Sequence, residues 1–141
     1  MEKKKYKKTY YNLIEKINDI AGMRIVCTLK DDIFFIKDLV KQIPDIHILN
    51  EKDYVTNPKP SGYSSYHMIV EVPVKLSQKT IYVKCEIQIR TLAMDFWASF
   101  EHKVKYKTEQ EVNKKTSKEL VNCAKMISKF DDKMISLKNI Q

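Results

Sequence analysis

Glycine and proline, the two residue types that most often punctuate a chain, are scarce in this sequence. Only two glycines and four prolines occur in 141 residues. One of the glycines and two of the prolines fall within Asn57–Gly62, which concentrates the turn chemistry in one place. No low-complexity linker is visible elsewhere in the sequence. We therefore expect a folded chain with one distinctive loop at 57–62.

Paired cysteines and long apolar runs are also missing. Cys27, Cys85 and Cys123 lie far apart and follow no paired spacing, which is typical of a protein from a reducing cytoplasm. The basic stretch Met1–Lys8 is not followed by an apolar segment, and no stretch approaches the roughly 20 apolar residues of a membrane span. We expect a cytoplasmic protein that is neither exported nor inserted into a membrane.

Positive charge, in contrast, is present in excess. The chain has 26 lysine and arginine residues against 18 aspartate and glutamate residues, which gives a net charge of +8. This excess favours polyanionic partners, although lysines spread over solvated faces produce the same balance. The length suits a single compact domain spanning residues 1–141.

Hydrophobic periodicity predicts the elements of the first third of the chain. Residues 10–20 place apolar side chains at helical spacing, which predicts a helix that delivers Asp19 at its end. Met23–Leu29 is typical of a buried strand. Asp31 or Asp32 is placed to cap a second helix that ends near Pro44. The expected apolar face of that helix includes Phe34, Phe35, Leu39 and Val40.

The middle of the chain predicts strands. Ile46–Leu49 forms a short one, and Tyr66–Val72 and Thr80–Ile89 are longer runs rich in β-branched and aromatic residues. Ser77–Lys79 supplies the turn between the last two. We expect these two strands to form an antiparallel hairpin.

Two helices are expected at the end of the chain. Thr91–Tyr106 returns to helical periodicity, and a longer helix spans about 112–137. In the longer helix, two apolar series recur every seven residues: Leu120, Ile127 and Met134, then Cys123, Phe130 and Leu137. This stripe either packs onto the chain's own sheet or pairs with another subunit, and the sequence leaves both alternatives open. The order of helices and strands is that of an α+β chain.

Two carboxylates stand out by position. Asp19 comes just before one predicted strand, and Glu86 lies inside another. Ionised carboxylates are costly to bury unless they are paired or bind a metal, and Mg²⁺ held by one or two carboxylates is a common arrangement. Solvated edge residues or salt-bridge partners are the alternative.

The segment that follows the Pro-rich loop carries side chains suited to a nucleotide. Lys59, Tyr63 and His67 combine a cation, an aromatic stacking surface and a polar strand residue, and Arg24 and Arg90 add charges complementary to phosphates. A tyrosine-rich surface turn is the alternative. His67 has no histidine or cysteine neighbour at a spacing that would form a zinc site.

Three segments together resemble the synthetase motifs of RelA/SpoT alarmone enzymes, in the small single-domain subgroup. They are Asn18–Arg24, Lys59–His67 and Glu86–His102, and they follow one another in the family's order. The resemblance covers about residues 17–107. It implies a mixed β-sheet flanked by helices, the nucleotidyltransferase fold related to DNA polymerase beta. It also implies transfer of pyrophosphate from ATP to the 3′-hydroxyl of GDP or GTP, with AMP as the other product.

The resemblance also implies roles for individual residues. Asp19 and Glu86 match the acidic pair that positions Mg²⁺, and Glu86 is also placed to help deprotonate the attacking hydroxyl. Tyr63 resembles the residue that stacks on guanine, and Ala98 the residue whose backbone meets the guanine edge. The remaining matches place Lys52, Lys59 and His67 at the acceptor nucleotide, Arg24 near the ATP phosphates, and Gln88 and Arg90 along the same strand as Glu86.

The sequence departs from the family pattern at two points. Ser61 stands where many relatives have asparagine, and the Arg-x-Lys-Ser-like stretch that grips ATP in relatives has no match here. We therefore expect ATP-dependent transfer that is weak or dependent on residues outside this sequence. Three alternatives stay open: an adenosine-nucleotide acceptor, the 3′ end of tRNA as acceptor, and a non-catalytic module that binds guanine nucleotides. Assembly into a homo-oligomer through the helices is also expected.

Overall fold

The computed structural model describes residues 21–107 and 113–140. The helix predicted for residues 10–20, and with it Asp19, lies outside the described residues. The described chain contains seven elements: β1 (Ala21–Cys27), α2 (Lys30–Gln42), β2 (His47–Asp53), β3 (Tyr66–Lys75), β4 (Thr80–Thr91), α3 (Leu92–Lys107) and α4 (Lys114–Lys138). Every predicted helix and strand that falls on the described residues therefore occurs where periodicity placed it, with ends shifted by a few residues.

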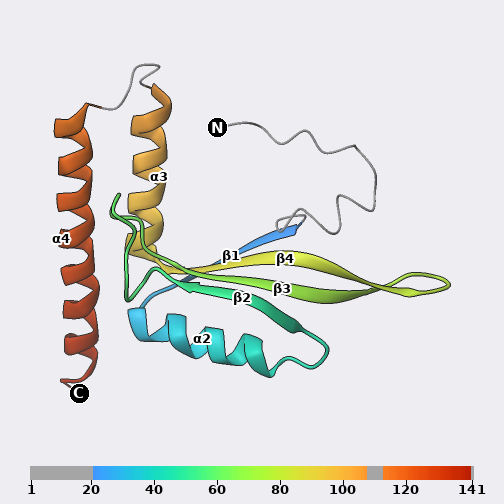
Figure 1. Ribbon diagram of the computed structural model, residues 1–141. Helices are drawn as coiled ribbons and strands as arrows, with labels where there is room; N and C mark the ends of the chain where they lie inside the picture. The colour runs from blue at the N-terminus through green and yellow to red at the C-terminus, as the bar shows by residue number, and fades with distance from the viewer. Residues whose placement is uncertain (1–20, 108–112, 141) are drawn as a thin grey trace.

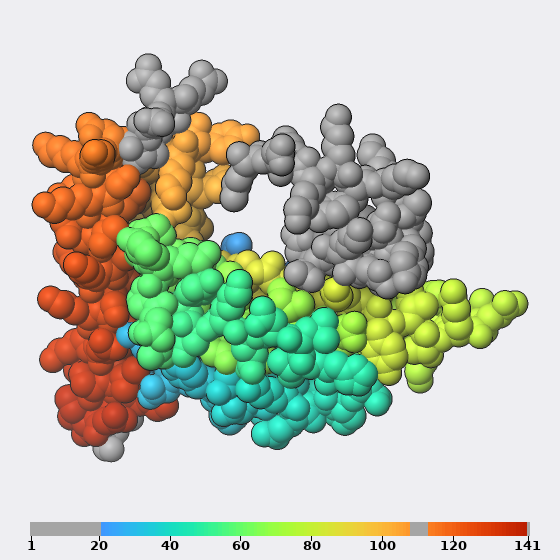
Figure 2. All heavy atoms as spheres, viewed as in Figure 1, coloured from blue at the N-terminus to red at the C-terminus, as the bar shows by residue number. Residues whose placement is uncertain are grey.

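The four strands form one mixed sheet in the order β1-β4-β3-β2. The predicted hairpin is confirmed, because β3 pairs antiparallel with β4 from Tyr66 opposite Ile89 to Lys75 opposite Thr80. β2 also pairs antiparallel with β3. β1 pairs parallel with β4 at the other edge, with Arg24 in register with Gln88. The far end of the β3–β4 hairpin projects from the body of the molecule (Figures 1 and 2). The mixed sheet with helices, an α+β arrangement, is the fold that the sequence predicted.

The helices cover one face and one end of this sheet. α2 packs beneath the sheet against β4, and α3 and α4 lie side by side at the end where β4 finishes (Figure 1). Local capping explains where two helices start. The Thr91 hydroxyl accepts a hydrogen bond from the Met94 amide at 3.1 Å, and the Asn113 side chain accepts one from the Lys115 amide at 3.1 Å.

The start of α2 differs from the prediction in detail. Leu29, rather than Asp31 or Asp32, occupies the capping position. Asp32 still contributes, because its carboxylate accepts a hydrogen bond from the Leu29 amide at 3.2 Å. This is the return half of a capping box, which needs an acidic residue three positions into the helix.

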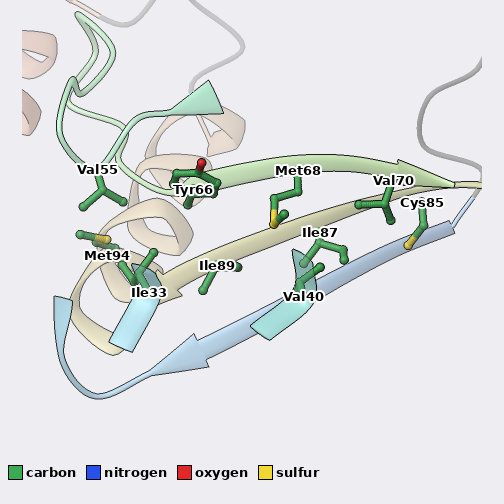
Figure 3. Close-up of a cluster of buried hydrophobic side chains, with 10 residues drawn as sticks. All are labelled: Ile33, Val40, Val55, Tyr66, Met68, Val70, Cys85, Ile87, Ile89 and Met94. Carbon is green, nitrogen blue, oxygen red and sulfur yellow. The ribbon is translucent and has the colours of Figure 1, made fainter. Parts of the chain in front are cut away.

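The hydrophobic core lies between the sheet and α2 (Figure 3). Its buried side chains are Ile33, Val40, Val55, Tyr66, Met68, Val70, Cys85, Ile87, Ile89 and Met94. Two predictions about burial are wrong in part. On α2, Val40 is buried and Phe34 packs against the core as predicted, but Phe35 and Leu39 are exposed, and Ile33 is buried. The second is the buried strand predicted for Met23–Leu29. β1 is an edge strand with largely exposed side chains, since the described part of the chain covers only the face that carries Ile25 and Cys27.

The long helix α4 packs onto its own chain through the first of the two predicted apolar series but not through the second. Leu120 and Asp131 are buried, and Ala124, Ile127 and Met134 are half-buried. The inward series is therefore Leu120, Ile127 and Met134 together with Ala124 and Asp131, which follow the first two of them by four positions. Cys123, Phe130 and Leu137 of the predicted second series are exposed, because they lie to one side of that seam. None of the described helices combines the length and apolar character needed to cross a membrane.

Candidate functional site

The segment between β2 and β3, residues 54–65, forms a closed loop that we call the Tyr63 loop. At its base the Tyr54 amide donates to the Ser65 carbonyl at 3.0 Å. At its tip the Lys59 amide donates to the Tyr63 carbonyl at 2.9 Å, and the Gly62 amide donates to the Lys59 carbonyl at 2.8 Å. These bonds hold the Tyr63 ring and the Lys59 side chain on one rigid turn.

Gly62 allows the Tyr63 loop to pack closely against the helices. Its φ of +95° lies in the region that favours glycine, and a Cβ at this position would stand 2.7 Å from the Cβ of Ala124 and 3.2 Å from Cζ2 of Trp97. The buried Trp97 is itself held, because its indole nitrogen donates to the Leu120 carbonyl at 2.9 Å. α3 and α4 thus form the backing of the loop.

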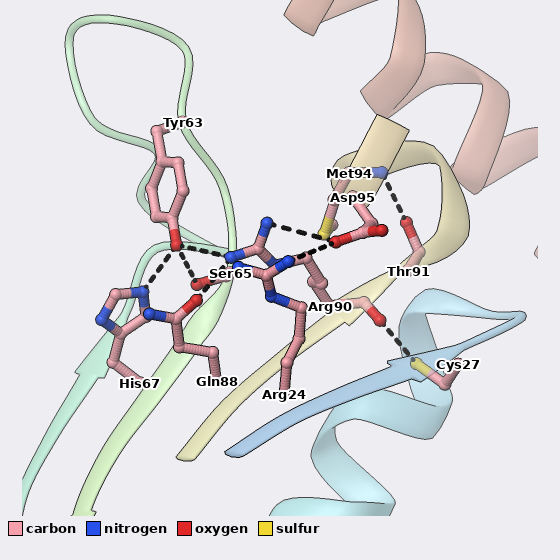
Figure 4. A network of polar contacts seen from close by, with 10 residues as sticks. All are labelled: Arg24, Cys27, Tyr63, Ser65, His67, Gln88, Arg90, Thr91, Met94 and Asp95. Carbon is pink, nitrogen blue, oxygen red and sulfur yellow. Dashed lines mark hydrogen bonds and ion pairs between the residues drawn. The ribbon is translucent and has the colours of Figure 1, made fainter. Parts of the chain in front are cut away.

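The hydroxyl of Tyr63 is the centre of a polar network that joins the loop to the sheet (Figure 4). It lies 2.9 Å from Nε2 of His67 and 3.1 Å from the buried hydroxyl of Ser65. One guanidinium nitrogen of Arg90 donates to it at 3.1 Å, and the same nitrogen donates to the Gln88 side-chain carbonyl. A phenol with this many partners has little freedom to rotate away.

His67 connects this network to Glu86. Its Nδ1 lies 3.2 Å from Oε1 of Glu86, which also accepts from the Gln88 amide nitrogen at 3.2 Å. Burial lowers the pKa of His67, although the Glu86 carboxylate acts in the opposite direction. A neutral ring with its proton on Nδ1 satisfies both neighbours, since it donates to Glu86 and accepts from the Tyr63 hydroxyl at Nε2.

Two lysines add positive charge beside these rings. The ammonium of Lys59 lies over the Tyr54 ring, 4.8 Å from its centroid, and over the Tyr63 ring at 5.1 Å. Lys52 is directly opposite His67 in the β2–β3 register, so the exposed Lys52 side chain shares the face of the sheet that carries His67.

Two arginines occupy the β1 side of the site. Arg90 of β4 is buried, with a side chain 3% exposed, whereas Arg24 of the edge strand is 53% exposed. Burial lowers the pKa of Arg90, and Tyr63 and Asp95 oppose that effect. Both guanidinium groups face the carboxylate of Asp95.

A cavity of about 600 Å³ opens where these groups meet. Five of the residues predicted to act on substrate line it, together with His102: Arg24, Tyr63, Gln88, Arg90 and Ala98. Its walls therefore offer an aromatic ring, two guanidinium groups and helix backbone. This combination can hold a base by stacking and a chain of phosphates by charge.

The structure brings together nearly all the residues that the sequence singled out. Lys59, His67 and Glu86 join the lining residues through the Tyr63 network, and Lys52 lies on the same face one strand away. Asp19 lies outside the described residues. The sequence argument missed Tyr54, Ser65 and Asp95. Asp95 had a usable signal, because a carboxylate in the first turn after Arg90 would face that side chain.

Of the two predicted metal ligands, the described part of the chain contains Glu86. No group of three or more histidine, cysteine or acidic side chains converges among residues 21–107 and 113–140. Glu86 is 25% exposed, and only its Oε1 has hydrogen-bond partners among the described residues. Oε2 is therefore available as a hard oxygen ligand of the kind that Mg²⁺ prefers.

Comparison with known proteins identifies relatives of this arrangement. Residues 1–111 match the family described as the region found in RelA/SpoT proteins. The chain is 48% identical to the GTP pyrophosphokinase YwaC of Bacillus subtilis over 124 residues, which are 88% of this chain and 59% of that protein. The chain thus spans less than two thirds of that relative's length.

Solved structures agree with the family match. The small alarmone synthetase 2 of Bacillus subtilis superposes with a TM-score of 0.86 at 47% identity, covering 90% of this chain and 69% of that one. The small alarmone synthetase 1 of the same organism, bound to its product pppGpp, gives 0.84 at 36% identity, covering 92% and 66%.

Proposed function

Because this chain belongs to the RelA/SpoT family, we propose that it is the catalytic core of a GTP/GDP pyrophosphokinase. It transfers pyrophosphate from ATP to the 3′-hydroxyl of GDP or GTP, and its partners are therefore these nucleotides. The observation that carries the proposal is the direct link between the Tyr63 ring, which we call the aromatic wall of the cavity, and the carboxylate of Glu86. Tyr63 contacts His67 at 2.9 Å, and His67 contacts Glu86 at 3.2 Å.

The acceptor nucleotide is held by the Tyr63 loop. The guanine base stacks on the Tyr63 ring, and the backbone at Ala98 meets its edge across the cavity. Lys59, Lys52 and His67 face the acceptor's phosphates. Stacking on a fixed ring loses little conformational entropy, so the hydrogen bonds that lock Tyr63 favour binding directly.

The transfer step requires a base and positive groups that stabilise the negative charge developing on the phosphate oxygens. The 3′-oxygen attacks the β-phosphorus of ATP, the bond from that phosphorus to the α–β bridging oxygen breaks, and AMP leaves. Glu86 accepts the proton of the hydroxyl. Arg24, together with Arg90 and Gln88 behind it, faces the ATP phosphates, where guanidinium groups stabilise the charge that develops on oxygen.

A Mg²⁺ ion fits the chemistry of this donor set. Glu86 offers Oε2, which has no hydrogen-bond partner among the described residues, and Asp19, three positions before the residue in register with Glu86, is the second proposed ligand. When bound, the ion would neutralise phosphate charge and help align donor and acceptor.

The decisive test uses the whole chain with Mg²⁺, ATP labelled in its β- and γ-phosphates, and GDP or GTP. We expect a labelled guanosine product and an equal amount of AMP. Direct titration with GDP should show binding with or without ATP. Failure to form product and failure to bind either guanine nucleotide would together refute the proposal. Replacement of GDP by AMP or by tRNA tests the alternative acceptors in the same assay.

Assembly is part of the same proposal. The outward face of α4 carries exposed apolar side chains, with Met126 68% and Phe130 54% exposed. A homo-oligomer would cover this face. Light scattering of the chain and of Phe130→Asp should then give different masses, and a monomeric wild type would contradict the assembly.

A further inference from the structure

Asp95 lies between the two arginines of the site. It belongs to the first turn of α3, and its Oδ1 lies 3.5 Å from a terminal nitrogen of Arg24 and 3.4 Å from a terminal nitrogen of Arg90 (Figure 4). The two arginines come from neighbouring strands, β1 and β4. The Asp95 carboxylate is therefore shared by the guanidinium groups of Arg24 and Arg90. Among the described residues, no hydrogen bond joins these two arginines directly.

The charges around this carboxylate do not balance without it. Arg90 is almost fully buried, its Nε has no hydrogen-bond partner in the described part of the chain, and Arg24 is a second cation close by. The other acidic groups of the site are engaged elsewhere: Glu101 pairs with Lys105 at 3.0 Å, and Glu86 contacts His67. Two guanidinium groups held side by side repel each other unless an anion lies between them.

The consequence extends through Arg90 to the aromatic wall. Arg90 donates to the Tyr63 hydroxyl at 3.1 Å, and its guanidinium lies 5.5 Å from the centroid of the Tyr63 ring. Arg24, on the other side of Asp95, projects from the edge strand into the cavity that Tyr63 also lines. Asp95 thus contacts Arg90, which is one of the side chains that hold Tyr63, and Arg24, which lines the same cavity from the edge strand.

We propose that Asp95 is a positioning residue that holds Arg24 and Arg90 at a fixed separation and so sets the distance between the two nucleotides. This inference rests on the proposed function, because it assigns Arg24 to ATP and Tyr63 to the acceptor. Without the carboxylate, Arg24 turns to solvent and Arg90 loses its counter-charge. The position of Arg24 then changes more than that of Arg90, because Arg90 keeps its contacts with Tyr63 and Gln88.

The kinetic test compares Asp95→Asn in two backgrounds. In the otherwise unchanged chain we expect kcat/KM for ATP to fall about tenfold, with a much smaller change in KM for GDP, since misplacing a binding group by about 1 Å has effects of this order or larger. In an Arg24→Ala background the same substitution should change kcat/KM for ATP by less than about twofold, because coupled residues are not additive. Asp95→Glu, which keeps the charge, should restore part of the loss.

A matched control removes the same charge elsewhere. Asp38→Asn lies on α2, where Asp38 pairs with Lys37 at 3.1 Å and is 59% exposed. It should leave both nucleotide constants unchanged. A carboxylate in the first turn of a helix also stabilises that helix, because its negative charge interacts favourably with the helix dipole. If Asp95 did only that, Asp95→Asn would lower the melting temperature and reduce activity by the same factor with and without Arg24, which would overturn the proposal.

A second measurement does not depend on turnover. The Nε–Hε signals of Arg24 and Arg90 in a ¹⁵N-labelled protein report the surroundings of each guanidinium. We expect Asp95→Asn to move both signals and Asp38→Asn to move neither. Unchanged signals in Asp95→Asn would reject the inference even in an active enzyme. A wild type without pyrophosphate transfer would instead count against the proposed function, while the arginine signals would still decide the role of Asp95.

Discussion

The two sides of the cavity, which we propose bind the acceptor and the donor nucleotide, are built differently. On the acceptor side, Tyr63 is hydrogen-bonded to three neighbours, and the loop that carries it is backed by Trp97 and α4. On the donor side, Arg24 projects from an exposed edge strand and has one long ion pair among the described residues, to Asp95. Within residues 21–107 and 113–140, the acceptor side is preorganised, whereas few contacts hold the donor side.

This contrast separates two ways of binding a nucleotide. A wall whose side chains are already fixed binds a nucleotide more tightly, because little conformational entropy is lost on binding. A half-exposed arginine must be ordered by its ligand or by its counter-charge. Substitutions on the acceptor side should therefore affect one nucleotide and the stability of the fold, and those on the donor side should affect the other nucleotide alone.

The largest effect is expected where the two sides meet. Glu86→Gln removes the proposed base and a proposed metal ligand while keeping the shape of the side chain, so transfer should fall at least about 100-fold. GDP binding should persist, because the Tyr63 wall remains. The product assay and a GDP titration measure the two quantities. Glu71→Gln, on the same sheet beside His47, is the matched control, and an active Glu86→Gln would contradict the assignment.

The next largest effect concerns the backing of the acceptor side. Leu120→Ala empties a buried position next to Trp97 and should lower the free energy of unfolding by about 2–5 kcal/mol. Lys129→Ala, at an exposed position of the same helix, should change it by no more than about 0.5 kcal/mol. Urea denaturation at one fixed protein concentration measures both. Equal losses would show that α4 does not pack through the seam that contains Leu120.

A smaller effect is expected for the aromatic wall itself. Tyr63→Ala removes base stacking, which contributes about 1–3 kcal/mol to nucleotide binding, so KM for GDP should rise while KM for ATP changes little. Tyr63→Phe keeps the ring and loses only the hydroxyl network, and should retain most of the acceptor affinity. Steady-state kinetics with each nucleotide varied in turn decides this. Parallel increases for both nucleotides would remove the distinction between the two sides.

The smallest effect concerns pH and the base of β4. Asp131 of α4 is buried and accepts a hydrogen bond from Thr91, next to Arg90, at 2.7 Å. Burial raises its pKa, with the Thr91 hydrogen bond and Lys30 opposing. The folded state thus holds this proton more tightly than the unfolded state. Asp131 therefore favours folding at pH values below its ordinary pKa, and that contribution is lost as pH rises through the raised value.

Asp131→Asn stays neutral and can still accept from Thr91. Its free energy of unfolding relative to the wild type should therefore increase as pH rises from about 4 to 7. Thermal or urea unfolding at several pH values measures the difference. A pH-independent difference for Asp131→Asn would contradict the account.

Much of the fold was predictable because it depends on local pattern. Alternating apolar residues and a polar turn define the β3–β4 hairpin, and helical periodicity defines α2, α3 and α4. The Tyr63 loop was visible as a cluster of proline and glycine. What could not be predicted is which side of an element is covered. Phe35 and Phe130 lie at helical spacings that suit a core, yet both face solvent, because the neighbouring elements pack against other stripes.

The candidate site divides in the same way. The sequence alone determined that Glu86, Gln88 and Arg90 lie on one face of a strand, since side chains alternate along an extended chain. Only the tertiary structure decided that Arg24 stands beside Gln88, that His67 links Tyr63 to Glu86, and that Asp95 lies between two arginines. These contacts join segments far apart in the chain, and their geometry depends on strand order and register, which no local pattern encodes.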